Sequence, residues 1–327
     1  MRKIIMWGAA AVLLTAVIGY IYMLVSDPWA EKDKPILFVP KSVDGRIDFW
    51  QVLGQGVYMA AKEFGEKVQT VGTVAESDID GQIALLEKAI GEQPKAIVMA
   101  ASDYDRLVPV AKMIKAAGIP LITVDSGLNG GISASFIATD NYEAGRKAAD
   151  SMLEWAQKDA KIALVNSVKG ASATMDRERG TRDRLKEAGG VTVLEQSYYS
   201  DASESKAYDI VIKLLQEELG INGMICMNEP STVGAAKAIK DLGFSSRIKL
   251  VGFDASTDEI AFLEEGVIQA IVVQNPFNMG YLAVRTAVDV MNGRDVERLI
   301  DTGSEVITKQ NMYTKENQKL LFPFEGQ

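Results

Sequence analysis

The segment Ile119-Pro120-Leu121-Ile122-Thr123-Val124-Asp125 decides how this chain folds. Gly118 lies directly before it, where a preceding helix is expected to end in a left-handed C-cap. Pro120 cannot prolong that helix, and the apolar residues after it predict a short buried strand that closes on the carboxylate of Asp125. A helix followed at once by a strand is the repeating unit of an α/β chain.

The same unit repeats on both sides of this segment. We predict strands at residues 36–39, 68–74, 96–101, 120–125, 136–139, 161–166, 191–197, 223–227, 248–253 and 268–273. Segments with helical spacing lie between most of them, and residues 50–64 are an example. The apolar face of that helix contains Leu53, Val57, Ala60, Ala61 and Phe64. Gly189 and Gly243 also stand where helices should end. This alternation predicts parallel sheets with helices on both faces and right-handed crossovers.

Ten strands in a chain of 327 residues are too many for one comfortable sheet. We therefore expect an α/β fold with two doubly wound parallel-sheet lobes. No Pro-, Gly- or Ser-rich linker separates the two halves, so the connections between the lobes should be short.

Composition excludes several classes of function. The net charge is −9, and its charged residues are interspersed, which argues against a nucleic-acid partner. The chain has no histidine, the commonest acid–base group and metal ligand. Its one cysteine, Cys226, lies in an apolar run and is interpreted as a small buried hydrophobe. We expect no cofactor and no metal site.

The amino-terminal residues predict a membrane span. Arg2 and Lys3 precede a nearly uncharged stretch, residues 4–25, which as a helix at about 1.5 Å per residue can cross a hydrocarbon core of about 30 Å. The exit around Ser26 offers no small-residue cleavage site, so we interpret residues 1–34 as an uncleaved signal anchor with a short linker; a cleaved signal is the alternative. The positive-inside rule places the remaining module on the extracytoplasmic side of the cell membrane.

Four apolar runs close on a polar side chain. These side chains are Asp125, Asn228, Asp254 and Gln274. The carboxyl ends of parallel strands are where doubly wound sheets bind ligands, which favours a binding site built from these residues. Asn228 and Asp254 also precede helices, so capping of those helices is an alternative for each.

Two aromatic residues and an arginine complete the candidate site. Phe49 and Trp50 open the first predicted helix, and flat aromatic faces pack against the C–H face of a sugar ring. Core packing is the alternative for Trp50. Arg177 lies early in the helix after strand 161–166, where a guanidinium could hold two ligand oxygens; a solvated helix face is its alternative. Carboxylates, amides and a guanidinium together suit a polyol.

The module resembles the ribose-binding-protein group of type I periplasmic binding proteins, which share their fold with lac-repressor-type effector domains. The resemblance covers residues 35–327 and is carried by four motifs. They are the segment 119–125 quoted above, Ala138-Thr139-Asp140-Asn141 with Gly145, Arg177-Glu178-Arg179-Gly180, and Val251-Gly252-Phe253-Asp254.

The resemblance implies two lobes of discontinuous chain joined by a three-strand hinge. One lobe would comprise residues 35–138 plus 275–302, and the other residues 139–274 plus 303–327. It also implies a sugar held in the cleft between them. The site it implies is Phe49, Trp50, Asp125, Arg177, Asn228, Asp254 and Gln274.

Three departures from ribose binders indicate that the sugar is not held as ribose is. Ser126 stands where ribose binders carry an arginine, and Ala202 stands near the position of a further stacking aromatic, although Tyr198 and Tyr199 are close. Ile47-Asp48 replaces the familiar Asn-Pro pair, within a longer loop. There is no calcium loop of the galactose-binding kind.

The sequence thus predicts a binding module that closes on a monosaccharide and delivers it to an ABC-type permease. A partner of a membrane sensor histidine kinase is the alternative. A glycosidase using Asp125 and Asp254 is disfavoured because nothing positions a leaving-group acid. A lac-repressor-type regulator needs a DNA-binding domain where this chain has its apolar stretch.

Overall fold

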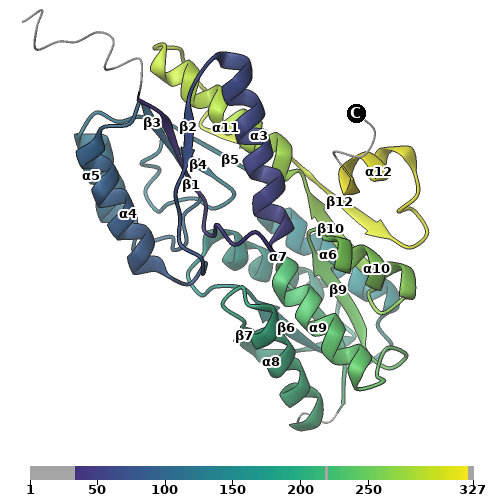
Figure 1. Ribbon diagram of the computed structural model, residues 1–327. Coiled ribbons are helices and arrows are strands. Elements are labelled where there is room, and N and C mark those ends of the chain that lie inside the picture. The colour runs from purple at the N-terminus through teal and green to yellow at the C-terminus, as the bar shows by residue number, and fades with distance from the viewer. Residues whose placement is uncertain (1–33, 218–219, 323–327) are drawn as a thin grey trace, which may run out of the picture.

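The computed structural model describes residues 34–217 and 220–322. The predicted signal anchor lies outside these residues except for Lys34. Within the described ranges, no helix combines the length and the apolar character needed to cross a membrane. The described residues form two α/β lobes that lie side by side (Figure 1), each built on a largely parallel sheet, as the sequence predicted.

The first lobe is built on a six-stranded sheet in the order β11-β5-β4-β3-β1-β2, in which every pairing is parallel. Its strands are β1 (Ile36–Val39), β2 (Val68–Thr70), β3 (Ala96–Met99), β4 (Leu121–Val124), β5 (Ser135–Ala138) and β11 (Leu299–Asp301). Helices α3 (Asp48–Phe64) and α11 (Pro276–Met291) cover one face, and α4 (Ile79–Glu92) and α5 (Val108–Ala116) cover the other. Alternate residues of β1 enter different cores: Ile36 and Phe38 pack under α3, while Leu37 and Val39 pack under α4 and α5.

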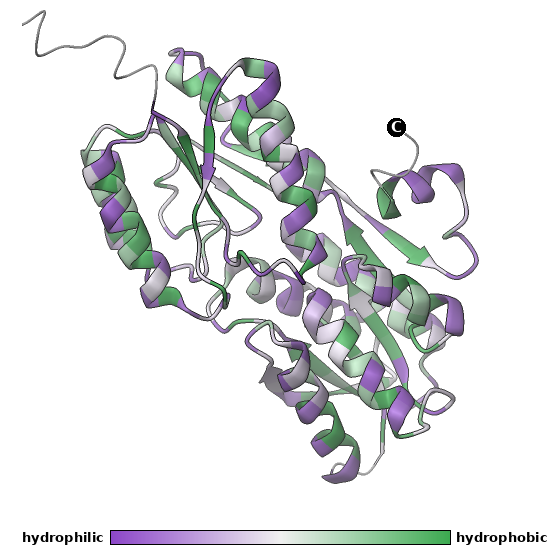
Figure 2. Cartoon of the chain, viewed as in Figure 1, coloured by the Kyte–Doolittle hydropathy of each residue, from purple (hydrophilic) through white to green (hydrophobic). Residues whose placement is uncertain are grey.

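The second lobe has a six-stranded sheet in the order β12-β10-β9-β8-β6-β7. Its strands are β6 (Ala160–Asn166), β7 (Val191–Tyr199), β8 (Ile221–Cys226), β9 (Lys249–Phe253), β10 (Ala270–Gln274) and β12 (Ser304–Thr308). The surrounding helices are α6 (Asn141–Trp155), α7 (Ser172–Ala188), α8 (Glu204–Glu217), α9 (Glu229–Asp241), α10 (Thr257–Glu265) and α12 (Lys315–Leu321). In both lobes the strands are mostly hydrophobic and the outer helix faces are hydrophilic (Figure 2), which is the pattern of sheets buried on both sides.

All ten predicted strands are present, with ends that differ by a few residues. The largest difference is at residues 68–74, where only Val68–Thr70 pair with β1 at the edge of the sheet. Two strands, β11 and β12, were not predicted, and β12 runs antiparallel to β10, so the second sheet is not purely parallel. Gly118, Gly189 and Gly243 all have positive φ at helix ends, but Gly189, with ψ of −175°, does not have the left-handed helical conformation that was expected.

Glycines bring helices together in each lobe. A Cβ at Gly56 of α3 would lie 2.0 Å from the carbonyl oxygen of Phe277, and a Cβ at Gly280 of α11 would lie 2.1 Å from that of Leu53. In the second lobe, a Cβ at Gly145 would lie 2.1 Å from the carbonyl oxygen of Arg177. These backbone contacts leave no room for a side chain, and the last one fixes how closely Arg177 approaches α6.

The chain passes between the two sheets three times within the described residues. These passages follow β5, β10 and β11, and they are short: β5 ends at Ala138 and α6 begins at Asn141, and β11 ends at Asp301 and β12 begins at Ser304. Near the third passage, the N–H of Asp140 donates to Asp301 Oδ1 at 3.0 Å.

Candidate functional site

All seven candidate residues line one cavity between the lobes. Phe49, Trp50 and Asp125 reach it from the first lobe; Arg177, Asn228, Asp254 and Gln274 reach it from the second. The cavity also contains residues that the sequence analysis did not single out, namely Lys41, Glu76, Ser167, Thr174 and Glu229. The fold therefore brings together side chains that lie more than 200 positions apart along the chain.

Asp125 and Asp254 occupy equivalent places in the two sheets. Each follows a central strand, has a left-handed backbone with φ of 61° and 78°, and donates its N–H to the neighbouring strand, to Ile137 O at 2.9 Å and Val272 O at 3.0 Å. Non-glycine residues seldom adopt this conformation, and aspartate tolerates it better than most. The turn ends the strand, and both carboxylates line the cavity.

Asp125 forms a buried ion pair that the sequence did not reveal. Lys41 Nζ lies 2.7 Å from Asp125 Oδ2, and both side chains are almost fully buried. Ser126 Oγ donates to the same oxygen at 3.0 Å. Lys41 Nζ also lies 5.8 Å from the centre of the Trp50 ring. A lysine that follows β1 by two residues thus stands beside Asp125, which follows β4 of the same sheet.

Phe49 and Trp50 serve both the core and the cavity. Their rings meet edge to face, with centroids 4.9 Å apart and planes at 88°. Trp50 Nε1 donates to Glu76 Oε1 at 2.7 Å. Both rings pack in the core under α3, so the core-packing interpretation of Trp50 holds alongside its place in the cavity wall. Burial raises the pKa of Glu76, and the charge of Lys41 opposes this shift.

Arg177 is buried and held on two sides. Its Nε donates to Asn141 Oδ1 at 2.8 Å and its Nη1 to the carbonyl oxygen of Met227 at 2.6 Å. The guanidinium carbon lies 4.4 Å from the centre of the Phe253 ring. The alternative of a solvated helix face is wrong for Arg177, and it fits Arg179, which is exposed.

Asp254 belongs to a network of hydrogen bonds rather than to a helix cap. Its Oδ1 accepts a bond from Gln274 Nε2 at 2.6 Å, and its Oδ2 accepts one from the N–H of Glu229 at 3.1 Å. Helix α10 is capped by Ser256 instead. Among the described residues, Gln274 Oε1 is buried without a hydrogen-bond partner. Burial raises the pKa of Asp254, and the charge of Arg177 opposes this shift.

Asn228 does cap a helix. Its Oδ1 accepts bonds from Ser231 N at 3.2 Å and Ser231 Oγ at 2.5 Å, which confirms the capping alternative for this residue. It lines the cavity as well. Tyr198 and Tyr199 are not among the residues that line it.

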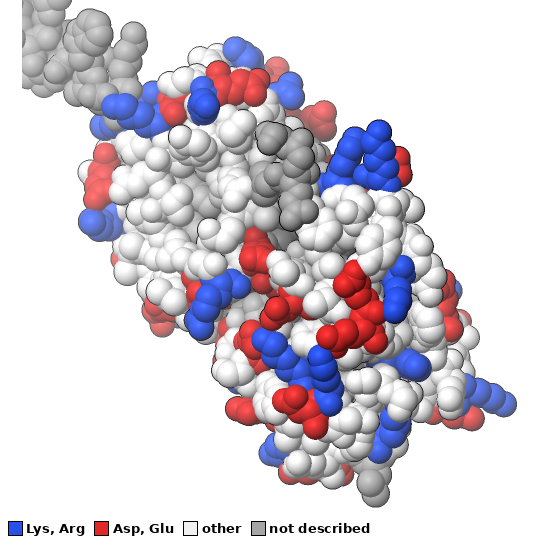
Figure 3. Space-filling view, turned by 45° about the vertical axis from the view of Figure 1, so that its right-hand side comes forward, with Lys and Arg blue, Asp and Glu red and all other residues white. Residues whose placement is uncertain are grey.

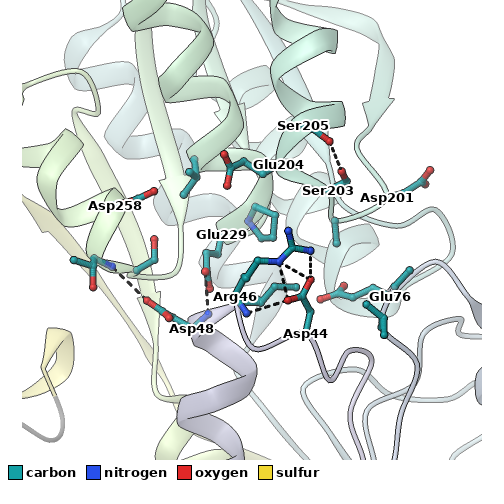
Figure 4. Close-up of a pocket in the computed structure, with 18 residues that line it drawn as sticks. Asp44, Arg46, Asp48, Glu76, Asp201, Ser203, Glu204, Ser205, Glu229 and Asp258 are labelled. Carbon is teal, nitrogen blue, oxygen red and sulfur yellow. Dashed lines mark hydrogen bonds and ion pairs between the residues drawn. The ribbon is translucent and has the colours of Figure 1, made fainter.

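A charged groove continues outward from the cavity (Figure 4). The two share Ile47, Glu76, Glu229 and Pro230. The groove is lined by carboxylates from both lobes, among them Asp48 and several that pair with nearby lysines or arginines. Figure 3 shows acidic side chains next to basic ones across the middle of this face. Among the described residues, no cluster of three or more cysteines or carboxylates could hold a metal ion.

The lobes touch each other around the cavity. Gly127 N donates to Ser172 Oγ at 2.8 Å, and Tyr104 N donates to the carbonyl oxygen of Gly170 at 2.8 Å. Elsewhere, Glu229 of the second lobe accepts two hydrogen bonds from the start of α3, and Asp48 Oδ2 accepts one from Thr257 N at 3.4 Å. The structure therefore has the cleft in a closed arrangement.

Residues 36–295 match the family model of the periplasmic binding protein domain, so the chain belongs to that family. The ribose import binding protein of Bacillus subtilis is 29% identical over 262 residues, which are 80% of this chain and 84% of that protein. The D-allose-binding periplasmic protein of Escherichia coli is 26% identical over 250 residues, 74% of this chain and 80% of that protein.

Solved structures give the same result. A carbohydrate transporter solute-binding protein from Agrobacterium radiobacter in complex with D-arabinose has a TM-score of 0.84 and 30% identity, covering 88% of this chain and 98% of its own. A solute-binding protein of an ABC transporter from Agrobacterium vitis with bound D-fucose has a TM-score of 0.83 and 32% identity. The match covers 88% of this chain and 99% of that protein. The resemblance to type I periplasmic sugar-binding proteins is confirmed, and these relatives are binding proteins of sugar transport rather than enzymes.

Proposed function

We propose that this protein is a membrane-anchored, extracytoplasmic sugar-binding protein that closes on a monosaccharide and delivers it to an ABC-type transporter. One observation carries the proposal: aromatic and polar side chains from two lobes converge on a single buried cavity. Relatives with bound D-arabinose and D-fucose support a monosaccharide as the ligand.

The chemistry of the cavity fits a ligand rich in hydroxyl groups. Asp125 and Asp254 accept hydrogen bonds from hydroxyls, and the unpaired oxygen of Gln274 needs a donor. Arg177 supplies donors of its own. The Phe49 and Trp50 rings provide apolar surface for the C–H face of the sugar.

Closure would occur about the three chain passages between the sheets. We propose the lobe boundaries implied by the resemblance, residues 35–138 plus 275–302 and residues 139–274 plus 303–327. The ligand favours the closed form only as far as it binds that form better than the open one.

A thermal-shift screen of the full chain tests the proposal. D-ribose, D-allose, D-arabinose and D-fucose should be included, with titration calorimetry for each sugar that raises the melting temperature. Asp254→Asn keeps the side chain's size but removes a carboxylate acceptor, and it should abolish binding while the protein stays folded. If no monosaccharide shifts the melting temperature, or if Asp254→Asn binds like the parent, the proposal is wrong.

A sensing role is the second candidate, and the apolar stretch at residues 4–25 favours it. A membrane helix there would raise the concentration of the module near a membrane partner and could pair with the helix of a histidine kinase. Deleting the gene separates the two roles. Loss of sugar uptake with normal induction supports transport, and loss of induction with intact uptake supports sensing. Protease treatment of intact cells tests the topology, since the module should be digested from outside.

A further inference from the structure

Helix α3 is capped by a residue of the other lobe. Its N-cap residue, Ile47, offers no side-chain acceptor, so the first N–H groups of the helix need another partner. Asp48 N donates to Glu229 Oε1 at 3.0 Å (Figure 4), and Phe49 N donates to Glu229 Oε2 at 2.9 Å. Each oxygen of the Glu229 carboxyl group therefore satisfies one of these donors.

Glu229 is itself held within the site. It is the first residue of α9, it is 5% exposed, and its N–H donates to Asp254 Oδ2 at 3.1 Å. Asp254 in turn accepts the bond from Gln274. Hydrogen bonds therefore connect the first turn of α3 through Glu229 to two of the candidate sugar-binding side chains.

This contact differs from the other bonds between the lobes. The bonds of Gly127 to Ser172 and of Tyr104 to Gly170 are single and neutral. The bond from Thr257 N to Asp48 Oδ2 also involves a carboxylate, but it is single and longer, at 3.4 Å. Glu229 makes two bonds with a carboxylate, and it makes them to the turn that carries the aromatic rings of Phe49 and Trp50. When the lobes separate, both partners of this contact pass into water.

We propose that Glu229 is a positioning residue for closure, a helix cap that forms only in the closed protein and sets the first turn of α3 against the second lobe. The proposal rests on the proposed function, in that closure accompanies sugar binding. Glu229 would then set the affinity for every sugar that closes the cleft, without deciding which sugar is preferred.

Hydrogen exchange of the full chain tests the cap directly. In Glu229→Asp the carboxylate is one methylene too short to span both donors, and in Glu229→Gln one acceptor is replaced by a donor. The amides of Asp48 and Phe49 should exchange about tenfold faster in both variants, as expected for the loss of an N-cap. Glu204→Gln is the matched control, because Glu204 also lines the outer groove but pairs with Lys237. In this variant the amides of Asp48 and Phe49 should exchange at the same rate as in the parent.

Calorimetry with D-ribose and D-arabinose separates positioning from direct contact. Both Glu229 variants should weaken the affinity for the two sugars by the same factor, about tenfold. Unchanged exchange at Asp48 and Phe49, or an affinity loss confined to one sugar, would overturn the proposal. If the parent binds neither sugar nor any other in the screen, the proposed function fails, and the exchange rates alone decide whether Glu229 caps α3.

Discussion

At the scale of single residues, Lys41 and Asp125 form a buried ion pair that lines the cavity from the first lobe. Both side chains are almost fully buried, and Nζ lies 2.7 Å from Oδ2. Buried ion pairs add little net stability, but breaking one leaves a charge without compensation. Lys41 carries a compact ammonium charge with three rotatable donors, so its contact with Asp125 is less directional than that of a planar guanidinium would be.

Lys41→Met should lower the free energy of unfolding by about 3–5 kcal/mol, because it leaves the Asp125 carboxylate buried and unpaired. The double variant Lys41→Met/Asp125→Asn should lose less than the sum of the two single variants, since the charge is removed with its partner. Urea unfolding of the four proteins measures this coupling. Additive losses would show that the two groups do not interact.

Trp50 has two roles that substitution can separate. Trp50→Ala should weaken sugar binding by about 1–3 kcal/mol through lost stacking area. It should also lower the free energy of unfolding by about 3–5 kcal/mol, because the ring belongs to the core. Trp50→Phe keeps an aromatic ring but removes the donor to Glu76. It should therefore retain more sugar affinity and a higher free energy of unfolding than Trp50→Ala. Calorimetry and urea unfolding report the two effects, and equal losses in the two variants would contradict this division.

At the scale of elements, helix α3 links the core of the first lobe to the cleft. The middle of α3 packs closely on α11 through Gly56 and Gly280, and its first turn carries Phe49 and Trp50 into the cavity. A shift of α3 on α11 would therefore move both rings.

Gly56→Ala should destabilise the protein by about 1–3 kcal/mol or more, because the new methyl would meet the backbone of α11. Gly54→Ala on the same helix is the control. Its Cβ would meet only Phe38, at 4.0 Å, so alanine should stabilise the helix by about 0.5–1 kcal/mol. Thermal unfolding compares the two, and similar effects at both positions would show that the close helix packing is not needed.

The strand-end residues were predictable because each one closes a local apolar run. Asp125 and Asp254 needed only that pattern and the rule that parallel strands end at the ligand-binding edge. Lys41 was missed because Pro40 separates it from the end of β1, and Glu76 was missed because it lies in a loop between β2 and α4. Strand β12 was missed because only Ile307 of its five residues is buried, so it lacks an apolar run; it also follows β11 after only two residues and pairs antiparallel with β10.

At the scale of the whole molecule, several buried carboxyl groups, among them Glu76, Glu229 and Asp254 of the cavity, affect how stability depends on pH. Burial raises the pKa of Glu76, Asp254 and Glu259, and it raises the pKa of Glu229 to about 8 from an ordinary 4.5, against the hydrogen bonds from Phe49 and Asp48. Such groups bind a proton more readily in the folded protein than in the unfolded chain.

The contribution of these four groups to stability should therefore fall as the pH rises. For Glu229 the contribution of the protonated form is fully present below about pH 4.5 and is lost as the pH rises through about 8. Glu229→Gln does not titrate, so the difference in free energy of unfolding between parent and variant should decrease across this window. Urea unfolding at a series of pH values measures it, and parallel profiles for the two proteins would contradict the raised pKa.

Cys226, the single cysteine of the chain, lies fully buried in β8, and burial raises the pKa of its thiol. Thiolates are the reactive form, so this sulfur stays inert toward alkylating reagents in the native state. A cysteine introduced on either lobe surface would consequently be the sole target for a fluorophore or spin label. Pairs of such labels could follow the distance between the lobes in the otherwise natural sequence.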